Sequence, residues 1–200
     1  MIHGRMGSGK TTLIDLLSRR KKIKKGELLY EMKNIYSYSK KEYNDQIAFV
    51  GQESKTPWGT VDKYLYKTIS KYSFNDKNSI ERKIGSIVQK MEIGDFQNKK
   101  LSTLSPGQFR WVKLAACIAA DTKVLFIDEI EMHLGKYEIN KLAKILYRKC
   151  NYDGVTLIAT TQNKELLNQR LSSIIVSLDN GKITSVRSSN KKNKKPDKRK

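Results

Sequence analysis

The sequence predicts an α/β fold built on a largely parallel sheet flanked by helices. Short apolar segments of strand character alternate with longer segments that repeat apolar residues at helical spacing, which is typical of this fold class. The segments 123–127 and 155–160 are rich in apolar and β-branched residues, as in strands that are buried on both faces. A glycine-rich loop at residues 4–9 leads directly into a helical segment, so a strand–loop–helix unit is expected where the chain begins.

The residues up to position 60 are predicted to form one helix and short strands. Apolar stretches bounded by turn residues indicate the strands, and the run after the glycine-rich loop has helical character. The expected elements are a strand stub at 1–3, a helix at 10–18, and strands at 26–32 and 45–50.

Residues 60–104 are predicted to form a small helical subdomain. Two groups of residues recur there at helical spacing. They are Tyr64, Leu65, Thr68, Ile69 and Tyr72, then Ile80, Ile84, Ile87, Val88 and Met91. Polar residues at 75–78 predict the turn between the two helices. We interpret the aromatic side chains of this segment as core residues rather than as a platform for stacking bases.

The second half of the chain returns to alternating helices and strands. Pro106 suits the first turn of a helix, and Asn180-Gly181 is a strong hairpin signal. The expected elements are helices at 106–120, 136–150 and 164–171, and strands at 123–127, 155–160, 173–178 and 183–186. The chain is interpreted as one domain, 1–187, followed by a disordered basic tail at 188–200 that has almost no apolar residues.

The net charge of +20 is concentrated in two segments. Residues 19–25 and 191–200 each contribute +6, which leaves +8 for the rest of the 200-residue chain. Such basic patches bind nucleic acid or acidic lipid, but they are also common as solvated surface in a lysine-rich composition, and both interpretations remain open. No apolar run approaches the roughly 20 residues that span a bilayer, and no signal peptide precedes the loop. Cys117 and Cys150 are expected to be reduced, packed thiols.

The glycine-rich loop fits the pattern G-x-x-x-x-G-K-[ST], which cradles nucleotide phosphates. Glycines let the backbone wrap around an anion, and the following helix presents its positive end to the phosphates. Lys10 is expected to reach the β- and γ-phosphates, and the Thr11 hydroxyl to ligate Mg²⁺. The predicted ATP-binding residues of the loop are Gly4, Arg5, Met6, Gly7, Ser8, Gly9, Lys10, Thr11 and Thr12.

Four further segments follow the loop in a fixed order. They are Ile47-Ala48-Phe49-Val50-Gly51-Gln52-Glu53, Leu104-Ser105-Pro106-Gly107-Gln108, Val124-Leu125-Phe126-Ile127-Asp128-Glu129, and Ala159-Thr160-Thr161-Gln162-Asn163. Together with the phosphate loop, they resemble the ATP-binding cassette (ABC) ATPases from residue 2 to about residue 186. The resemblance implies a P-loop NTPase fold, with ATP and Mg²⁺ as cofactors.

The resemblance also assigns roles to the residues of these segments. Gln52 matches the Q-loop glutamine, which ligates Mg²⁺ or orients the attacking water. Asp128 and Glu129 match the Walker B acids: Asp128 would hold Mg²⁺, and Glu129 would act as the catalytic base or position the water. Ser105, Gly107 and Gln108 match the signature motif, which in the family meets the γ-phosphate held by another cassette. The metal set is therefore Thr11, Gln52 and Asp128.

Several positions depart from the family pattern. Gln162 stands where the family has a switch histidine; it can hydrogen-bond a phosphate oxygen but cannot carry a proton. Pro106 replaces a signature glycine, and Gly135 replaces the D-loop aspartate. His133 is interpreted as part of that loop rather than as a metal ligand. ATP and Mg²⁺ binding is therefore expected, with Glu129 and Gln162 as the catalytic pair and with weakened hydrolysis.

The resemblance also implies N-terminal antiparallel strands and an adenine-stacking aromatic, which the family carries before its phosphate loop. This sequence is expected to lack them, whether through a late start, a fragment or a separate chain that supplies them.

The functional prediction is an ATP-binding subunit of an ABC transporter. The implied partners are a membrane permease and a second cassette, in a homo- or heterodimer, and the implied location is cytoplasmic, peripheral at the inner face of the membrane. Two alternatives remain: a soluble cassette ATPase that acts on nucleic acid or the ribosome, and a degenerate regulatory cassette.

Overall fold

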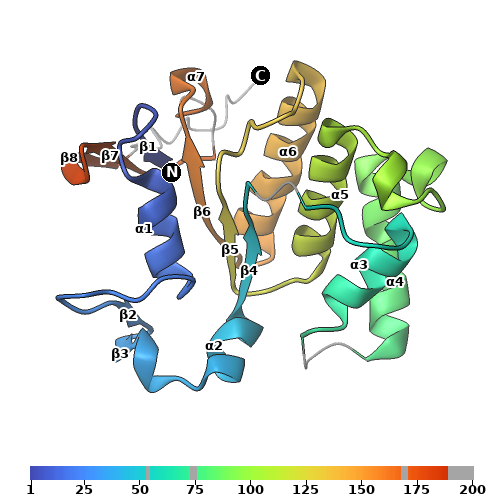
Figure 1. Cartoon of the computed structure of the whole chain (residues 1–200), viewed down its shortest axis with the longest axis horizontal. Coiled ribbons are helices and arrows are strands. Elements are labelled where there is room, and N and C mark those ends of the chain that lie inside the picture. Colours follow the sequence, from blue (N-terminus) through green and yellow to red (C-terminus); the bar gives the residue numbers. More distant parts are fainter. Residues whose placement is uncertain (53–54, 73–75, 168–170, 189–200) are drawn as a thin grey trace, which may run out of the picture.

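A six-stranded sheet forms the centre of the computed structural model, which describes residues 1–52, 55–72, 76–167 and 171–188 (Figure 1). The strand order is β4-β5-β6-β1-β7-β8, and all neighbours are parallel except the antiparallel pair β7–β8. The strands are β1 (Ile2–His3), β4 (Ile47–Val50), β5 (Val124–Ile127), β6 (Thr156–Thr161), β7 (Ile174–Asp179) and β8 (Lys182–Ser188). The predicted fold class is confirmed.

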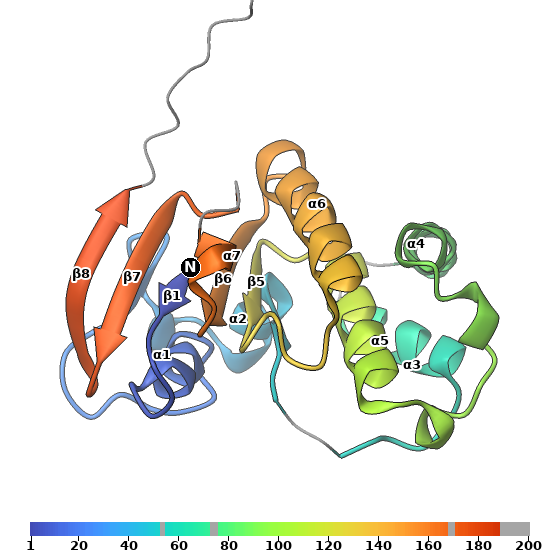
Figure 2. The same ribbon diagram turned by 90° about the horizontal axis from the view of Figure 1, so that it is seen from above.

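Helices cover both faces of this sheet, as Figure 2 shows from above. Helix α1 (Lys10–Leu17) and the short α2 (Lys40–Gln46) lie on one face, and α6 (Lys136–Tyr152) and α7 (Lys164–Leu167) lie on the other. Strand β5 shows why both faces need cover. Its residues Val124 and Phe126 join the apolar cluster under α1, whereas Leu125 and Ile127 join the larger cluster on the opposite face. The apolar strand predicted at 123–127 is thus buried on both sides.

Helices α3 (Val61–Ile69) and α4 (Lys77–Met91) pack beside the long α5 (Pro106–Ala119), as expected for the helical segment. Side-chain caps begin both helices: Thr60 accepts from Lys63 N, and Asp76 accepts from Ser79 N at 2.7 Å. Asp76 therefore starts α4 inside the predicted turn at 75–78, of which residue 75 lies outside the described residues. Short 3₁₀ turns, Gly94–Phe96 and Leu101–Thr103, lead back to α5.

Two strand predictions are wrong in extent. Only Leu29–Tyr30 of the segment 26–32 is a strand, β2, and it pairs with β3 (Lys33–Asn34) in a two-stranded hairpin outside the main sheet. The turn between them uses left-handed backbone at Glu31 and Met32. Residues 45 and 46 end α2, which begins with a capping box between Ser39 and Glu42, so β4 starts at Ile47.

The other predicted elements agree with the structure to within two residues, apart from α7 and from α3, which ends three residues before Tyr72. Helix α2 and strand β3 are elements that the sequence does not predict. The described part of α7 ends at Leu167, and residues 168–170 of the expected helix lie outside the described part of the chain, as does nearly all of the basic tail. Ser188, which was assigned to the tail, is the last residue of β8. Cys117 and Cys150 are free thiols in α5 and α6.

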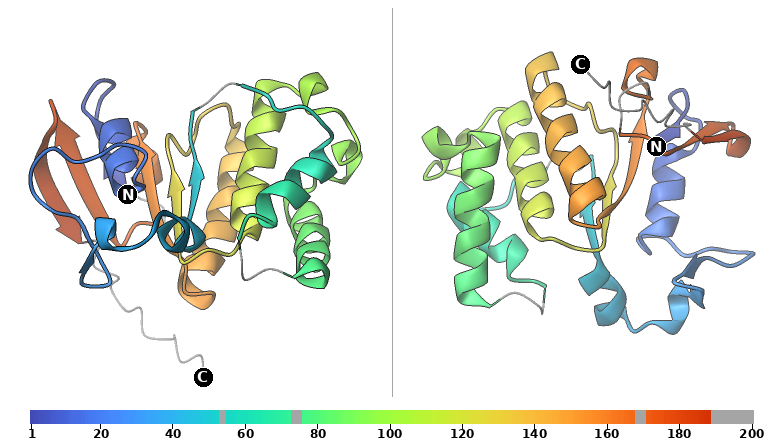
Figure 3. Two further views of the ribbon diagram at one scale, coloured as in Figure 1. Left: turned by 60° about the horizontal axis from the view of Figure 1, so that its bottom comes forward. Right: turned by 180° about the vertical axis from the view of Figure 1, so that it is seen from behind.

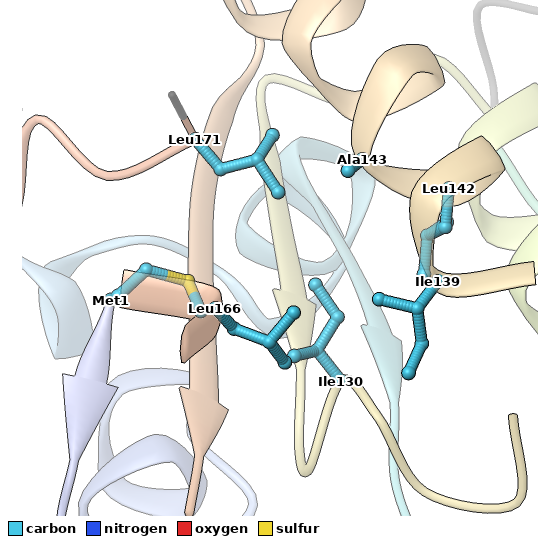
Figure 4. Close-up of a pocket in the computed structure, with 7 residues that line it drawn as sticks. All are labelled: Met1, Ile130, Ile139, Leu142, Ala143, Leu166 and Leu171. Atoms are coloured by element: carbon cyan, nitrogen blue, oxygen red, sulfur yellow. The ribbon is translucent and has the colours of Figure 1, made fainter. Parts of the chain in front are cut away.

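Apolar side chains seal the sheet against α6 and α7. Figure 4 shows Met1, Ile130, Leu142 and Leu166 among the side chains that surround a cavity of about 10 Å³ there. A space of that size is close to the minimum for a single water molecule, so this region is packed core rather than a ligand site. None of the helices within the described residues is long and apolar enough to cross a membrane.

Candidate nucleotide-binding site

The glycine-rich loop connects β1 to α1, as predicted. Gly7 and Gly9 have φ angles of 77° and 100°, in the left-handed region that glycine adopts without steric cost. At Gly4, a Cβ atom would lie 2.3 Å from Ser8 Oγ and 2.5 Å from the Leu178 carbonyl oxygen. The fold therefore requires the absence of side chains at these three positions.

The hairpin between β7 and β8 supports the loop from outside. Gly181, at the tip of this hairpin, donates its backbone N–H to the Ser8 carbonyl oxygen at 3.0 Å. Asn180 and Gly181 both have positive φ, as the Asn-Gly pair predicts. A turn far along the chain thus helps to fix the shape of the loop.

Lys10 and Ser8 give the loop its side-chain donors. The buried Lys10 donates from Nζ to the carbonyl oxygens of Gly4 and Arg5, both at 2.8 Å. Its ammonium therefore lies against the loop, close to the positive end of α1. The Ser8 hydroxyl is buried and has no hydrogen-bond partner among the described residues. An orphaned buried hydroxyl beside an ammonium and a helix N-terminus fits a loop that receives an anion.

Asp128 brings together the three residues predicted to hold metal. Its Oδ2 accepts from Thr11 Oγ1 at 2.9 Å and from Gln52 Nε2 at 2.7 Å, and Gln52 also reaches Thr11 at 3.3 Å. The three side chains come from α1, from the end of β4 and from the end of β5. Each carries an oxygen, the ligand type that Mg²⁺ prefers, so the donor set fits that ion.

Thr160 orients this aspartate, and sequence analysis missed it. Its Oγ1 donates to Asp128 Oδ1 at 2.6 Å and accepts from the backbone N–H of Glu129 at 2.7 Å. Thr160 is fully buried at the carboxyl end of β6. A hydroxyl near the end of an apolar strand, beside an acidic strand end, is the signal that would have identified it.

Glu129 and Gln162, the predicted catalytic pair, are in contact. Gln162 Nε2 donates to Glu129 Oε1 at 2.7 Å. Glu131 holds the other side of this pair, because its Oε1 accepts from Gln162 N at 2.8 Å and from Thr161 Oγ1 at 2.9 Å. Glu131 thus ties the loop that follows β5 to the end of β6.

Arg110 contacts three residues around the site by hydrogen bonds, and sequence analysis missed it. The side chain is 1% exposed and lies on α5, five residues after Ser105. It donates to the carbonyl oxygens of Gly51 (2.7 Å), Asp128 (2.7 Å) and Glu129 (3.0 Å). Burial lowers the pKa of the guanidinium and the Asp128 carboxylate raises it, yet arginine stays charged. The guanidinium of Arg110 therefore connects α5 to the carboxyl ends of two strands: β4, which precedes Gln52, and β5, which precedes Asp128 and Glu129.

The signature residues lie at the start of α5 and apart from the phosphate loop. Ser105 and Gln108 form a reciprocal capping box, and Pro106 occupies the first turn. A Cβ on Gly107 would lie 2.7 Å from the His133 carbonyl oxygen. Ser105, Gly107 and Gln108 line a hollow of about 530 Å³ together with residues 133–135. The chain thus holds a phosphate loop and a signature segment in two separate places.

A threonine and an aspartate that share a hydrogen bond at the head of a glycine-rich loop, on a parallel sheet, define a P-loop nucleotide-binding protein. Residues 1–131 match the family model described as "ABC transporter". The chain belongs to this family.

Curated relatives agree with this assignment. A putative ABC transporter ATP-binding protein of Methanosarcina mazei is 28% identical over 180 residues, covering 86% of this chain and 29% of the relative. The ATP-binding protein Uup of Buchnera aphidicola is 31% identical and covers 91% of this chain and 28% of the relative. The petrobactin import ATP-binding protein YclP of Bacillus subtilis is 27% identical, covering 90% of this chain and 72% of the relative.

Solved structures share the fold. A dimeric ATP-binding cassette in a post-hydrolysis state, bound to ADP and Pi, superposes with a TM-score of 0.81 at 22% identity, covering 94% of this chain and 83% of that one. The cbiO1 protein of Clostridium perfringens, part of an ABC transporter complex, superposes with a TM-score of 0.75 at 20% identity. The match covers 94% of this chain and 76% of that one. The chain spans less than a third of the first two curated relatives named above.

Proposed function

We propose that this chain is the ATP-binding subunit of an ABC transporter and that it hydrolyses ATP. The observation that carries the proposal is the contact of Thr11, Gln52 and Asp128 at the head of the phosphate loop. Family membership and the names of the relatives, several of which are import ATP-binding proteins, support it.

The phosphate loop would bind the triphosphate. The Lys10 ammonium would exchange two neutral carbonyl oxygens for charged phosphate oxygens, which are stronger acceptors. The Ser8 hydroxyl and the N-terminal end of α1 would supply further donors. Thr11, Gln52 and Asp128 would hold Mg²⁺, which neutralises charge on the phosphate oxygens when bound.

Glu129 would orient and deprotonate the attacking water, with Gln162 as its positioning residue. The amide of Gln162 fixes one carboxylate oxygen of Glu129 and leaves the other available to water. Gln162 carries no titratable proton, so proton transfer falls to Glu129 alone. Hydrolysis slower than in cassettes that have a histidine at this position is the expected consequence.

A second cassette would complete the site, in a homo- or heterodimer. Ser105, Gly107 and Gln108 lie in a hollow apart from the phosphate loop, so a bound γ-phosphate would need the signature segment of another copy. A similar solved cassette is a dimer bound to ADP and Pi, which supports this arrangement. Closing and opening of the dimer would drive a membrane permease, and the subunit would lie at the cytoplasmic face of the membrane, peripheral to it.

Calorimetric titration of the purified chain with ATP and Mg²⁺ tests the proposal. Lys10→Ala should abolish measurable binding, whereas the control Lys25→Ala, at an exposed position, should bind like wild type. Glu129→Gln should slow hydrolysis and trap an ATP-dependent dimer that light scattering detects. Equal ATP affinity in wild type and Lys10→Ala would refute the assignment of the phosphate loop as the nucleotide site. A Glu129→Gln chain that stays monomeric, alone and when mixed with other cassettes, would refute the shared site.

A further inference from the structure

A basic groove lies on the face of the molecule formed by α4, α5 and α6. These three helices lie side by side when the molecule is seen from behind (Figure 3, right). The groove has a volume of about 630 Å³, with α4 and α6 as its walls and the carboxyl end of α5 as its floor. Ile118 of this floor is 13 residues from Ser105, about 20 Å along the helix, so the groove is distinct from the nucleotide site.

Cationic side chains line both walls because the basic residues of each helix recur at helical spacing. On α6, Lys141, Lys144 and Arg148 follow each other at intervals of three and four residues, and on α4 Lys83 and Lys90 share one face. Lys83 and Lys149 already pair with Asp121, and Lys141 pairs with Glu92.

The unpaired cations of the groove are the feature that points to a ligand. Lys90, Lys144 and Arg148 are exposed, and none of the three has an ion-pair partner within the described ranges. They are positioned on both walls, so an acidic occupant would be held from two sides.

The floor of the groove is apolar. Ile118 lies in it, with Ile87 and Ile145 at the base of the two walls. Ile87 and Ile118 are only 4% and 3% exposed, so the accessible apolar surface comes mainly from Ile145 and from the aliphatic stems of the lysines. No aromatic side chain is among the residues that line the groove in the described structure, so it offers no platform for stacking bases. An apolar floor between cationic walls, framed by two helices, suits an amphipathic helix with acidic flanks better than a nucleic acid.

We propose that this groove docks an acidic amphipathic helix of a partner protein. Apolar residues of the helix would pack on Ile145 and on the aliphatic stems of the lysines, and its Glu or Asp side chains would pair with Lys90, Lys144 and Arg148. The groove reaches both α4, in the helical segment, and α6, on the sheet, so the occupant would contact both parts of the cassette. This proposal is independent of ATP hydrolysis.

Fluorescence anisotropy with the full chain tests it. The probe is a labelled 18-residue peptide that carries Leu at every third or fourth position and Glu elsewhere. The groove variant is Lys90→Glu/Lys144→Glu/Arg148→Glu. The matched control is Lys22→Glu/Lys24→Glu/Lys25→Glu, which makes the same change of charge in an exposed segment. A Glu-rich peptide without the leucines and a single-stranded RNA of 20 nucleotides are the competing probes.

The groove variant should lose at least tenfold in affinity for the acidic helix, and the control less than threefold. The peptide without leucines should bind at least tenfold more weakly than the amphipathic one. Equal losses in both triple variants would show non-specific attraction to net charge and overturn the proposal. RNA that binds more tightly than the peptide and loses that affinity in the groove variant would also overturn it, in favour of nucleic acid. The absence of any binding of the peptide by wild type would overturn it as well.

Discussion

The side-chain amide of Gln162 donates a hydrogen bond to Oε1 of Glu129 at 2.7 Å. The two residues come from the ends of neighbouring strands, β5 and β6, which are paired in register at Ile127 and Ala159. Parallel strands that end at the same edge of a sheet thus bring a carboxylate and an amide into contact. The contact fixes the carboxylate of Glu129 through an amide, which carries no titratable proton.

Replacement of Gln162 by alanine should reduce the rate of ATP hydrolysis and leave ATP affinity nearly unchanged. A hydrogen bond to a charged group contributes about 1.5–3 kcal/mol, which corresponds to roughly a 10- to 150-fold fall in kcat if the bond acts only in the transition state. Phosphate release under saturating ATP measures this effect. Gln89→Ala, on the exposed surface of α4, is the control and should hydrolyse ATP like wild type.

Gln162→His should instead raise hydrolysis, because imidazole both donates to Glu129 and exchanges a proton near neutral pH. An unchanged rate in this variant would mean that position 162 does not limit turnover.

Removal of the buried arginine should destabilise the whole fold. Arg110→Met leaves the carbonyl oxygens of Gly51, Asp128 and Glu129 without this donor. Each buried acceptor left without a donor lowers the free energy of unfolding by about 1–3 kcal/mol. Because the structure relaxes around the new side chain, we expect a total loss of about 3 kcal/mol in the free energy of unfolding. In a chain of this length that lowers Tm by roughly 6–12 °C. Calorimetry measures the shift.

Arg148→Met is the matched control, since this arginine is exposed on α6. A surface substitution of this kind should change the free energy of unfolding by less than about 0.5 kcal/mol. Equal Tm shifts in the two variants would show that the bonds of Arg110 contribute little.

The sequence predicts most of this site because the relevant residues stand at strand and helix ends. The alternation of apolar segments places Asp128 after β5 and Gln52 after β4, and parallel order then brings both to one edge. The glycine pattern likewise places Lys10 and Thr11 at the start of α1. Local patterns and the parallel order of the strands account for where these residues lie, whereas the roles of Gln52 and Asp128 follow from the resemblance to the ABC ATPases.

The sequence does not predict contacts that depend on tertiary packing. Arg110 lies in a helix whose other residues are mostly apolar, and only the fold shows that its guanidinium reaches three carbonyl oxygens on two loops. The strand expected at 26–32 failed for a related reason. Glu31 and Met32 adopt left-handed backbone, which their side chains disfavour and only the surrounding structure stabilises.

Substitution of Gly107 by even the smallest side chain should disturb the start of α5. A Cβ there would lie 2.7 Å from the His133 carbonyl oxygen, so the loop at 133–135 or the start of α5 must move. Gly107→Ala should therefore impair ATP-dependent association while ATP binding by the single chain persists. Light scattering and titration calorimetry on the same variant separate the two effects.

Gly85→Ala provides the control, because a Cβ at Gly85 meets nothing within 4 Å inside α4. That change should stabilise the chain by about 0.5–1 kcal/mol through helix propensity and leave association intact. If Gly107→Ala associates as well as wild type, the approach of His133 to the signature segment has no role in the dimer.

Asp121 should make the stability of the junction between α4 and α6 depend on pH. It follows α5 and pairs with Lys83 of α4 and with Lys149 of α6. Burial raises the pKa of the Asp121 carboxyl, but the hydrogen bond and charge of Lys149, together with Lys83, outweigh it, so this pKa lies below its usual value. A carboxyl of lowered pKa stabilises the fold above its unfolded pKa, about 4, and loses that contribution as the pH falls through the folded pKa.

The loss in free energy of unfolding caused by Asp121→Asn should therefore be largest near neutral pH. The carboxylate is more than one-third exposed, so solvent screening limits the expected loss to about 0.5–1 kcal/mol at about pH 7. The difference between wild type and variant should shrink as the pH falls below about 4 and through the lowered folded pKa, because the carboxyl then becomes protonated in both states of wild type. Urea unfolding across this pH range measures it. Glu81→Gln, at an exposed position of α4, should show no such pH-dependent difference. A constant difference for Asp121→Asn at every pH would mean that packing of the side chain, rather than its charge, stabilises the junction of α4 and α6.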